Sequence, residues 1–96
     1  MASLLSEREL DQALSQVPKW KYDLAGKRIV RAIKREAFMD GIDLVRDVAE
    51  LAEDQNHHPD IDIRWTEVTF SLSTHSAGGL TANDFALAKE IDALVD

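Results

Sequence analysis

The chain has 96 residues, of which 45% are hydrophobic and 30% are charged, and its formal net charge is −7 at pH 7. This length allows one domain with one modest core and leaves no room for a separate cofactor-binding domain. The negative charge disfavours direct binding to nucleic acid, and the absence of cysteine excludes disulfides, iron–sulfur clusters and thiolate zinc sites.

The first third of the chain predicts a helix followed by a β-hairpin. Ser6 and Glu9 have the spacing of a capping box, which predicts a helix over about residues 6–16. An alternation of polar and apolar residues around Trp20 and the apolar residues within 27–36 predict two strands joined by a turn.

The rest of the chain predicts a helix, a second hairpin and a last helix. Apolar residues recur with helical period over 40–56, which indicates an amphipathic helix. Period-two alternation over 61–66 and 68–73 predicts two half-buried strands. A second capping box, at Thr81 and Asp84, predicts the start of the last helix.

This order of elements, α-β-β-α-β-β-α, predicts an α+β fold in one domain over residues 1–96. We expect a two-layer arrangement in which three helices cover one face of a four-stranded antiparallel sheet. Trp65, Phe70 and Phe85 fit positions in the core between the layers.

The three histidines of the chain, His57, His58 and His75, all belong to this second half. Residues paired in an antiparallel hairpin have a constant sum of their numbers. A turn centred between Thr66 and Glu67 makes that sum 133, which places His58 opposite His75. Because imidazole changes its charge near neutral pH, a cluster of three predicts a proton-transfer site or a metal site.

Two other interpretations of the histidines remain open. One of the adjacent pair has a structural explanation, because a helix C-terminus favours histidine through its dipole and its free carbonyls. Three histidines can also bind zinc with one position left for water. Adjacent histidines in an extended segment point to opposite faces, however, which disfavours a shared metal.

Two carboxylates lie near the histidines in the sequence. Glu53 precedes His57 by four residues, so it would project from the same helical face and could orient that imidazole and raise its pKa. From periodicity alone, an exposed helix charge is the better explanation of Glu53. Asp84 needs no role beyond closing its capping box.

Several of these residues together resemble the signature of the pterin-4a-carbinolamine dehydratases. The matching residues are Glu53, His57-His58-Pro59, Trp65, Ser73-Thr74-His75 and Asp84. The resemblance extends over nearly the whole chain and implies that family's fold. It implies a hydro-lyase that removes water from a 4a-hydroxytetrahydropterin to give the quinonoid dihydropterin, recycling the pterin for aromatic amino acid hydroxylases. It implies no metal and no organic cofactor.

The resemblance also implies the residues of the site. Catalysis would fall to His57 as main proton donor, Glu53 as the group that orients it, His75 as the opposing proton carrier and His58 mainly as a pterin contact. Further pterin contacts would come from Asn56, Ser73, Thr74 and Ser76. The chain departs from the family where Ile61 replaces a frequent aromatic residue and where Asn56 and Ser76 replace acidic ones.

The same family includes proteins that serve as dimerisation partners of a transcription factor. A non-catalytic pterin-binding or assembly module of the same fold is therefore the alternative function. Family members commonly form homodimers and homotetramers, so we expect a homo-oligomer. The start of the sequence has no basic region followed by an apolar one, and no stretch approaches the roughly 20 apolar residues of a membrane span. We therefore expect a cytoplasmic protein with no membrane partner.

Overall fold

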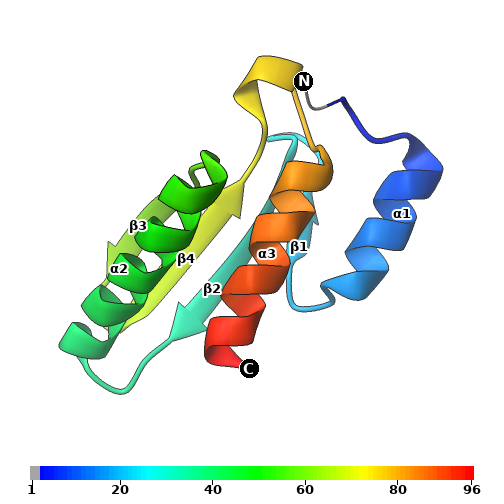
Figure 1. The fold of residues 1–96 in the computed structure, drawn as a ribbon. Coiled ribbons are helices and arrows are strands. Elements are labelled where there is room, and N and C mark those ends of the chain that lie inside the picture. The colour runs from blue at the N-terminus through cyan, green and yellow to red at the C-terminus, as the bar shows by residue number, and fades with distance from the viewer. Residues whose placement is uncertain (1–2) are drawn as a thin grey trace.

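The computed structural model describes residues 3–96, and its element order confirms the predicted α-β-β-α-β-β-α arrangement. Figure 1 shows α2 and α3 side by side across one face of the sheet, with α1 beyond them beside β1. The elements are α1 (Glu7–Gln16), β1 (Lys21–Asp23), β2 (Arg28–Lys34), α2 (Phe38–Gln55), β3 (Asp60–Arg64), β4 (Glu67–Leu72), a short 3₁₀ helix η1 (His75–Ala77) and α3 (Ala82–Val95).

Local capping sets the ends of the helices. Both predicted capping boxes are present, with Ser6 as the N-cap of α1 and Thr81 as the N-cap of α3. Helix α2 begins at Phe38, two residues before the predicted start, and ends at Gln55, with Asn56 as its C-cap. Asn56 adopts the left-handed conformation with φ 48°, which asparagine tolerates better than most residues, and the chain leaves the helix there.

The sheet is antiparallel throughout, with the strand order β1-β2-β4-β3. Strands β2 and β4 are central, and their alternate residues are buried beneath α2 and α3. The core includes Ile29, Ile33, Val48, Val68, Phe70, Leu72, Phe85, Leu87 and Ile91. This confirms the predicted core positions of Phe70 and Phe85. Leu10, Ala13 and Leu14 of α1 pack against the same core, so all three helices cover one side of the sheet.

The register of the β3–β4 hairpin differs from the prediction. Ile61 pairs with Phe70 and Ile63 with Val68, so paired residue numbers sum to 131 and the turn is centred between Trp65 and Thr66. His58 is therefore not opposite His75, and the prediction was wrong. Both registers pair apolar with apolar residues, so the alternation could not distinguish them.

Two further predictions for this hairpin were wrong. Trp65 is 79% exposed, because it occupies the turn with φ 51° instead of the core. Strand β3 is an edge strand whose five residues are all exposed, so Ile61 and Ile63 are not half-buried as expected. Strand β4 shows the predicted half-buried pattern, since it lies between two neighbouring strands and under the helices. No helix within residues 3–96 has both the length and the hydrophobicity to cross a membrane.

Candidate active site

His57 is held by a buried carboxylate. Its side chain is 11% exposed, and its Nε2 lies 2.6 Å from Oδ1 of Asp84, whose side chain is fully buried. An ionised carboxylate can only accept a hydrogen bond, so it holds the proton on Nε2. Neutral His57 then carries its free electron pair on Nδ1, where it can accept or, once charged, donate a proton.

The same aspartate closes the capping box of α3. Its Oδ2 accepts hydrogen bonds of 2.9 Å from the backbone N–H of Thr81 and from Oγ1 of Thr74. The hydroxyls of Thr74 and Thr81 lie 2.8 Å apart in this buried network. One carboxylate oxygen therefore anchors α3 to the segment after β4, and the other remains for His57. Asp84 thus contacts the site, although the sequence suggested only a cap.

His58 pairs with Glu53 at the surface. Its Nε2 lies 2.5 Å from Oε2 of Glu53, and both side chains are exposed. The expectation that Glu53 orients His57 was wrong. The helical spacing of four residues no longer applies after Asn56, because the left-handed turn there directs His57 inward to Asp84.

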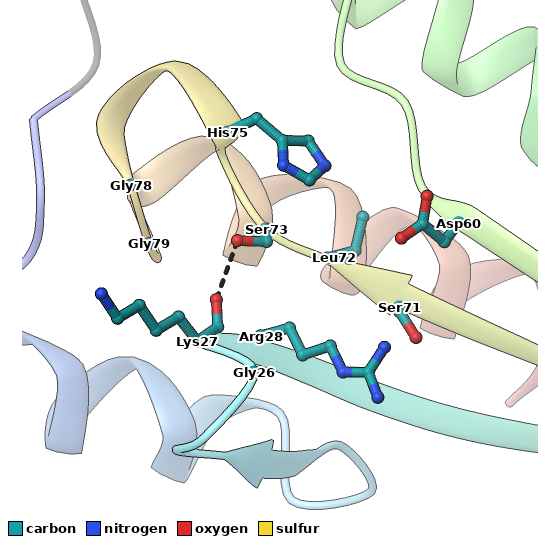
Figure 2. A pocket seen from close by; sticks show the side chains of 10 residues that line it. All are labelled: Gly26, Lys27, Arg28, Asp60, Ser71, Leu72, Ser73, His75, Gly78 and Gly79. Carbon is teal, nitrogen blue, oxygen red and sulfur yellow. Dashed lines mark hydrogen bonds between the residues drawn. The ribbon is translucent and has the colours of Figure 1, made fainter.

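His75, which follows Thr74 in the chain, lines a pocket. The backbone of Thr74 pairs with Gly79 across a tight loop, and Gly78 in this loop has φ 77°, a conformation that favours glycine. This loop exposes His75 at the rim of a pocket of about 430 Å³. Figure 2 shows the His75 ring above β4, directed toward the segment that leads to Asp60.

The floor and ends of this pocket come from three strands. Ser71 and Ser73 belong to β4 and its continuation, while Arg28 begins β2 and Asp60 begins β3. Ser73 also donates a 2.8 Å hydrogen bond to the backbone oxygen of Lys27. Arg28 and Asp60 were missed from the sequence, because only the order β2-β4-β3 brings them to opposite sides of the same strand.

The expected site residues thus fall into four groups. The pocket contains Ser73 and His75. Ser76, in η1, and Asn56, at the end of α2, are exposed. Thr74 is buried, with its hydroxyl bonded to Asp84.

His57 and His58 each have a separate carboxylate partner. Within residues 3–96, no three or more histidine, aspartate or glutamate side chains are grouped closely enough to hold a metal ion.

Comparisons with known proteins identify the family of this chain. The sequence profile of the family "Pterin 4 alpha carbinolamine dehydratase" matches residues 3–94. Relatives named "Putative pterin-4-alpha-carbinolamine dehydratase" include one from Mycobacterium tuberculosis, 52% identical over 92 residues and 96% of each chain. Another, from Mycolicibacterium smegmatis, is 48% identical over 93 residues and 97% of each chain.

A solved structure has the same fold. It is described as a transcriptional coactivator/pterin dehydratase from Brucella melitensis and superposes with a TM-score of 0.90 at 28% identity. The match covers 96% of this chain and 98% of that one. With a family profile over residues 3–94 and relatives at about half identity, this chain belongs to the pterin-4-alpha-carbinolamine dehydratase family, and a dehydratase of this kind is a hydro-lyase.

Proposed function

We propose that this protein is a 4a-hydroxytetrahydrobiopterin dehydratase that works by histidine acid–base catalysis. The observation that carries the proposal is the buried pair of His57 and Asp84, joined through Thr74 to the pocket at His75. A histidine held in one tautomer by a buried carboxylate is suited to proton transfer near neutral pH.

The reaction requires one proton to be delivered and one to be removed. The C4a–O bond breaks as the 4a-hydroxyl takes up a proton and departs as water. The proton on N5 is lost, and the electron pair it leaves forms the C4a=N5 double bond of the quinonoid dihydropterin. One acid and one base, placed on either side of the C4a–N5 bond, satisfy this balance.

The histidines divide these tasks in our proposal. His57 acts as the main proton donor through Nδ1. Asp84, and not the expected Glu53, is the residue that positions the His57 ring. His75, exposed at the pocket, is the opposing proton carrier. His58, held by Glu53 at the surface, serves mainly as a pterin contact. Exposed Asn56 and Ser76, with Ser73 in the pocket, complete the contacts to substrate.

A stopped-flow assay on freshly generated 4a-hydroxytetrahydropterin tests this proposal. We expect His57→Ala and His75→Ala each to slow dehydration by a factor on the order of 100 or more. His58→Ala is the comparison variant, and its main effect should be on KM. Wild-type turnover no faster than the spontaneous reaction would overturn the proposal.

A non-catalytic binding or assembly module is the second candidate. It is favoured by the similarity to the Brucella melitensis protein, whose structure is described as that of a transcriptional coactivator as well as a pterin dehydratase. The exposed edge strand β3, with Ile61 and Ile63, gives such a module a surface for assembly. A chain that binds pterin and forms a dimer or tetramer, yet fails to accelerate dehydration, would support this candidate over the enzyme.

The cellular setting that fits the proposed reaction is recycling of tetrahydropterin for aromatic amino acid hydroxylases in the cytoplasm. The acting form would be a homodimer or homotetramer of one-domain chains. Light scattering on the purified chain checks this, and a particle of monomer mass would contradict it.

A further inference from the structure

Leu4 and Leu5, which precede α1 and belong to no helix or strand, form a strap against the segment between η1 and α3. The backbone N–H of Leu5 donates a 3.1 Å hydrogen bond to the backbone oxygen of Leu80. Beside this bond, a Cβ added at Gly79 would lie only 3.0 Å from Cδ2 of Leu4. Figure 1 shows the dark blue strap beside the segment that leads from η1 to α3. The strap thus touches two consecutive residues just before α3.

The oxygen that Leu5 contacts belongs to the peptide group that also holds Asp84. The C=O of Leu80 and the N–H of Thr81 are the two ends of one planar peptide unit. This N–H donates to Oδ2 of Asp84 at 2.9 Å, and Oδ1 of the same carboxylate lies 2.6 Å from Nε2 of His57. Three hydrogen bonds in series therefore connect the backbone of Leu5 to the His57 ring.

This series of hydrogen bonds is shielded from water. Thr81 and Asp84 are fully buried and Leu80 is nearly so. In such surroundings each hydrogen bond polarises the next, and an unpaired backbone oxygen is costly. The two ends of a planar peptide turn together, so a rotation that takes the C=O of Leu80 from Leu5 also moves the N–H away from Asp84. The position of Asp84 therefore depends on the strap.

The strap lies outside the pocket at His75. Among residues 3–96, the lining of that pocket includes neither Leu4 and Leu5 nor the peptide group of Leu80 and Thr81. Any effect of the strap on the reaction must therefore pass through other residues. A substitution in the strap should change the rate of the bound substrate's conversion more than it changes KM.

We propose that Leu5 is a positioning residue for His57, an inference that rests on the proposed function. Its backbone N–H fixes the peptide group between Leu80 and Thr81, and this peptide group fixes the carboxylate of Asp84 against the His57 ring. The side chain of Leu5 packs against the core and holds the N–H in place. A misplacement of about 1 Å at a reacting group can slow a reaction on the order of a hundredfold, so a remote hydrogen bond can control the rate.

Amide hydrogen exchange of wild type tests whether the strap and the peptide group open together. We expect the amides of Leu5 and Thr81 to have protection factors within about tenfold of each other and the same dependence on low denaturant. A Leu5 amide that exchanges about a hundredfold faster than that of Thr81 would show that the strap detaches while the peptide group stays in place. That result would overturn the inference.

Leu5→Pro removes the N–H and keeps an apolar side chain. We expect the Thr81 amide to exchange about tenfold faster, because its peptide group loses a hydrogen bond. The NMR signal of the Nε2 proton of His57 should shift or be lost. The kcat of dehydration should fall about tenfold, with KM within about twofold of wild type.

Two control variants separate this effect from a general loss of stability. Ser3→Pro places a proline just before the strap, where residue 3 makes no hydrogen bond within residues 3–96. Ile33→Val removes a methylene from the buried end of β2 that pairs with Val68, away from the strap. Both should keep the wild-type exchange of Thr81, the wild-type His57 signal and the wild-type kcat. If Leu5→Pro does not fold, exchange in wild type decides the question.

The readouts distinguish failure of the inference from failure of the proposed function. If wild type does not dehydrate the substrate, faster Thr81 exchange and a changed His57 signal in Leu5→Pro still support the inference, while the proposed activity is lost. If wild type is active, Leu5→Pro with an unchanged His57 signal or an unchanged kcat overturns the inference and leaves the activity standing.

Discussion

Asp84→Asn is the substitution that most directly tests how His57 is controlled. Asparagine has nearly the shape of aspartate, and its carbonyl oxygen can take the place of Oδ2. It would then keep the hydrogen bonds from Thr81 and Thr74 that cap α3. The amide nitrogen would replace Oδ1 and face Nε2 of His57 as a donor. His57 must then accept at Nε2 and carry its proton on Nδ1, which reverses its tautomer.

The expected loss of stability in Asp84→Asn comes from one hydrogen bond, which becomes weaker because it is no longer charge-assisted. A charge-assisted bond between His57 and Asp84 becomes a neutral one, and the two capping bonds remain. We expect a loss of about 1 to 2 kcal/mol in the free energy of unfolding. For a chain of this size that lowers Tm by roughly 4–16 °C. The rate of dehydration should fall by a factor on the order of 100 or more, because the wrong nitrogen carries the proton.

Nitrogen NMR of histidine-labelled protein measures the tautomer directly. Wild type should show a protonated Nε2 and an unprotonated Nδ1 for neutral His57, and Asp84→Asn should show the reverse. Glu53→Gln is the control, because it changes the partner of His58 and leaves that of His57 intact. A variant Asp84→Asn that kept the wild-type tautomer and the wild-type rate would refute the reasoning.

Three further predictions concern stability. Hydrogen bonds from Arg31, and secondly from Lys19, hold the pKa of Asp96 well below its usual range. The ionised Asp96 therefore stabilises the folded state above about pH 4, and this stabilisation is lost as the pH falls through the lowered pKa. Arg31→Met should lower Tm at pH 7 and flatten the fall of Tm below pH 4, as measured by thermal denaturation across pH; an unchanged acid profile would contradict this. Trp65→Gly should keep the fold and change the free energy of unfolding by less than about 1 kcal/mol, because glycine accepts the left-handed turn and little packing is lost. Trp20→Ala removes a buried indole and should cost about 3–5 kcal/mol, and equal losses for the two tryptophans in urea titrations would refute the assigned burial.

The elements of the fold could be predicted because their signals are local. Ser6 with Glu9 and Thr81 with Asp84 place two helix starts through bonds that span three residues. The alternation of β4 follows from its position in the sheet interior, where each residue faces either the core or the open side. Such signals depend on neighbouring residues only, so the sequence contains them in full.

The partners within the site depended on contacts between distant segments. The histidines were recognised from their spacing in the family signature, but their carboxylate partners were assigned by helical spacing from Glu53. The left-handed conformation of Asn56 ends the helical spacing, so His57 pairs with Asp84 and not with Glu53. The backbone conformation of Asn56 therefore determines that His57 pairs with Asp84.

By itself, the sequence determined the element order, the helix caps and the histidines that mark the family. The hairpin register, the exposure of Trp65 and the placement of Arg28 and Asp60 on either side of β4 depend on tertiary contacts. The physical reason is that strand pairing joins residues far apart in the chain, and registers that keep apolar residues on one face satisfy the same pattern. Packing of the whole domain selects among them.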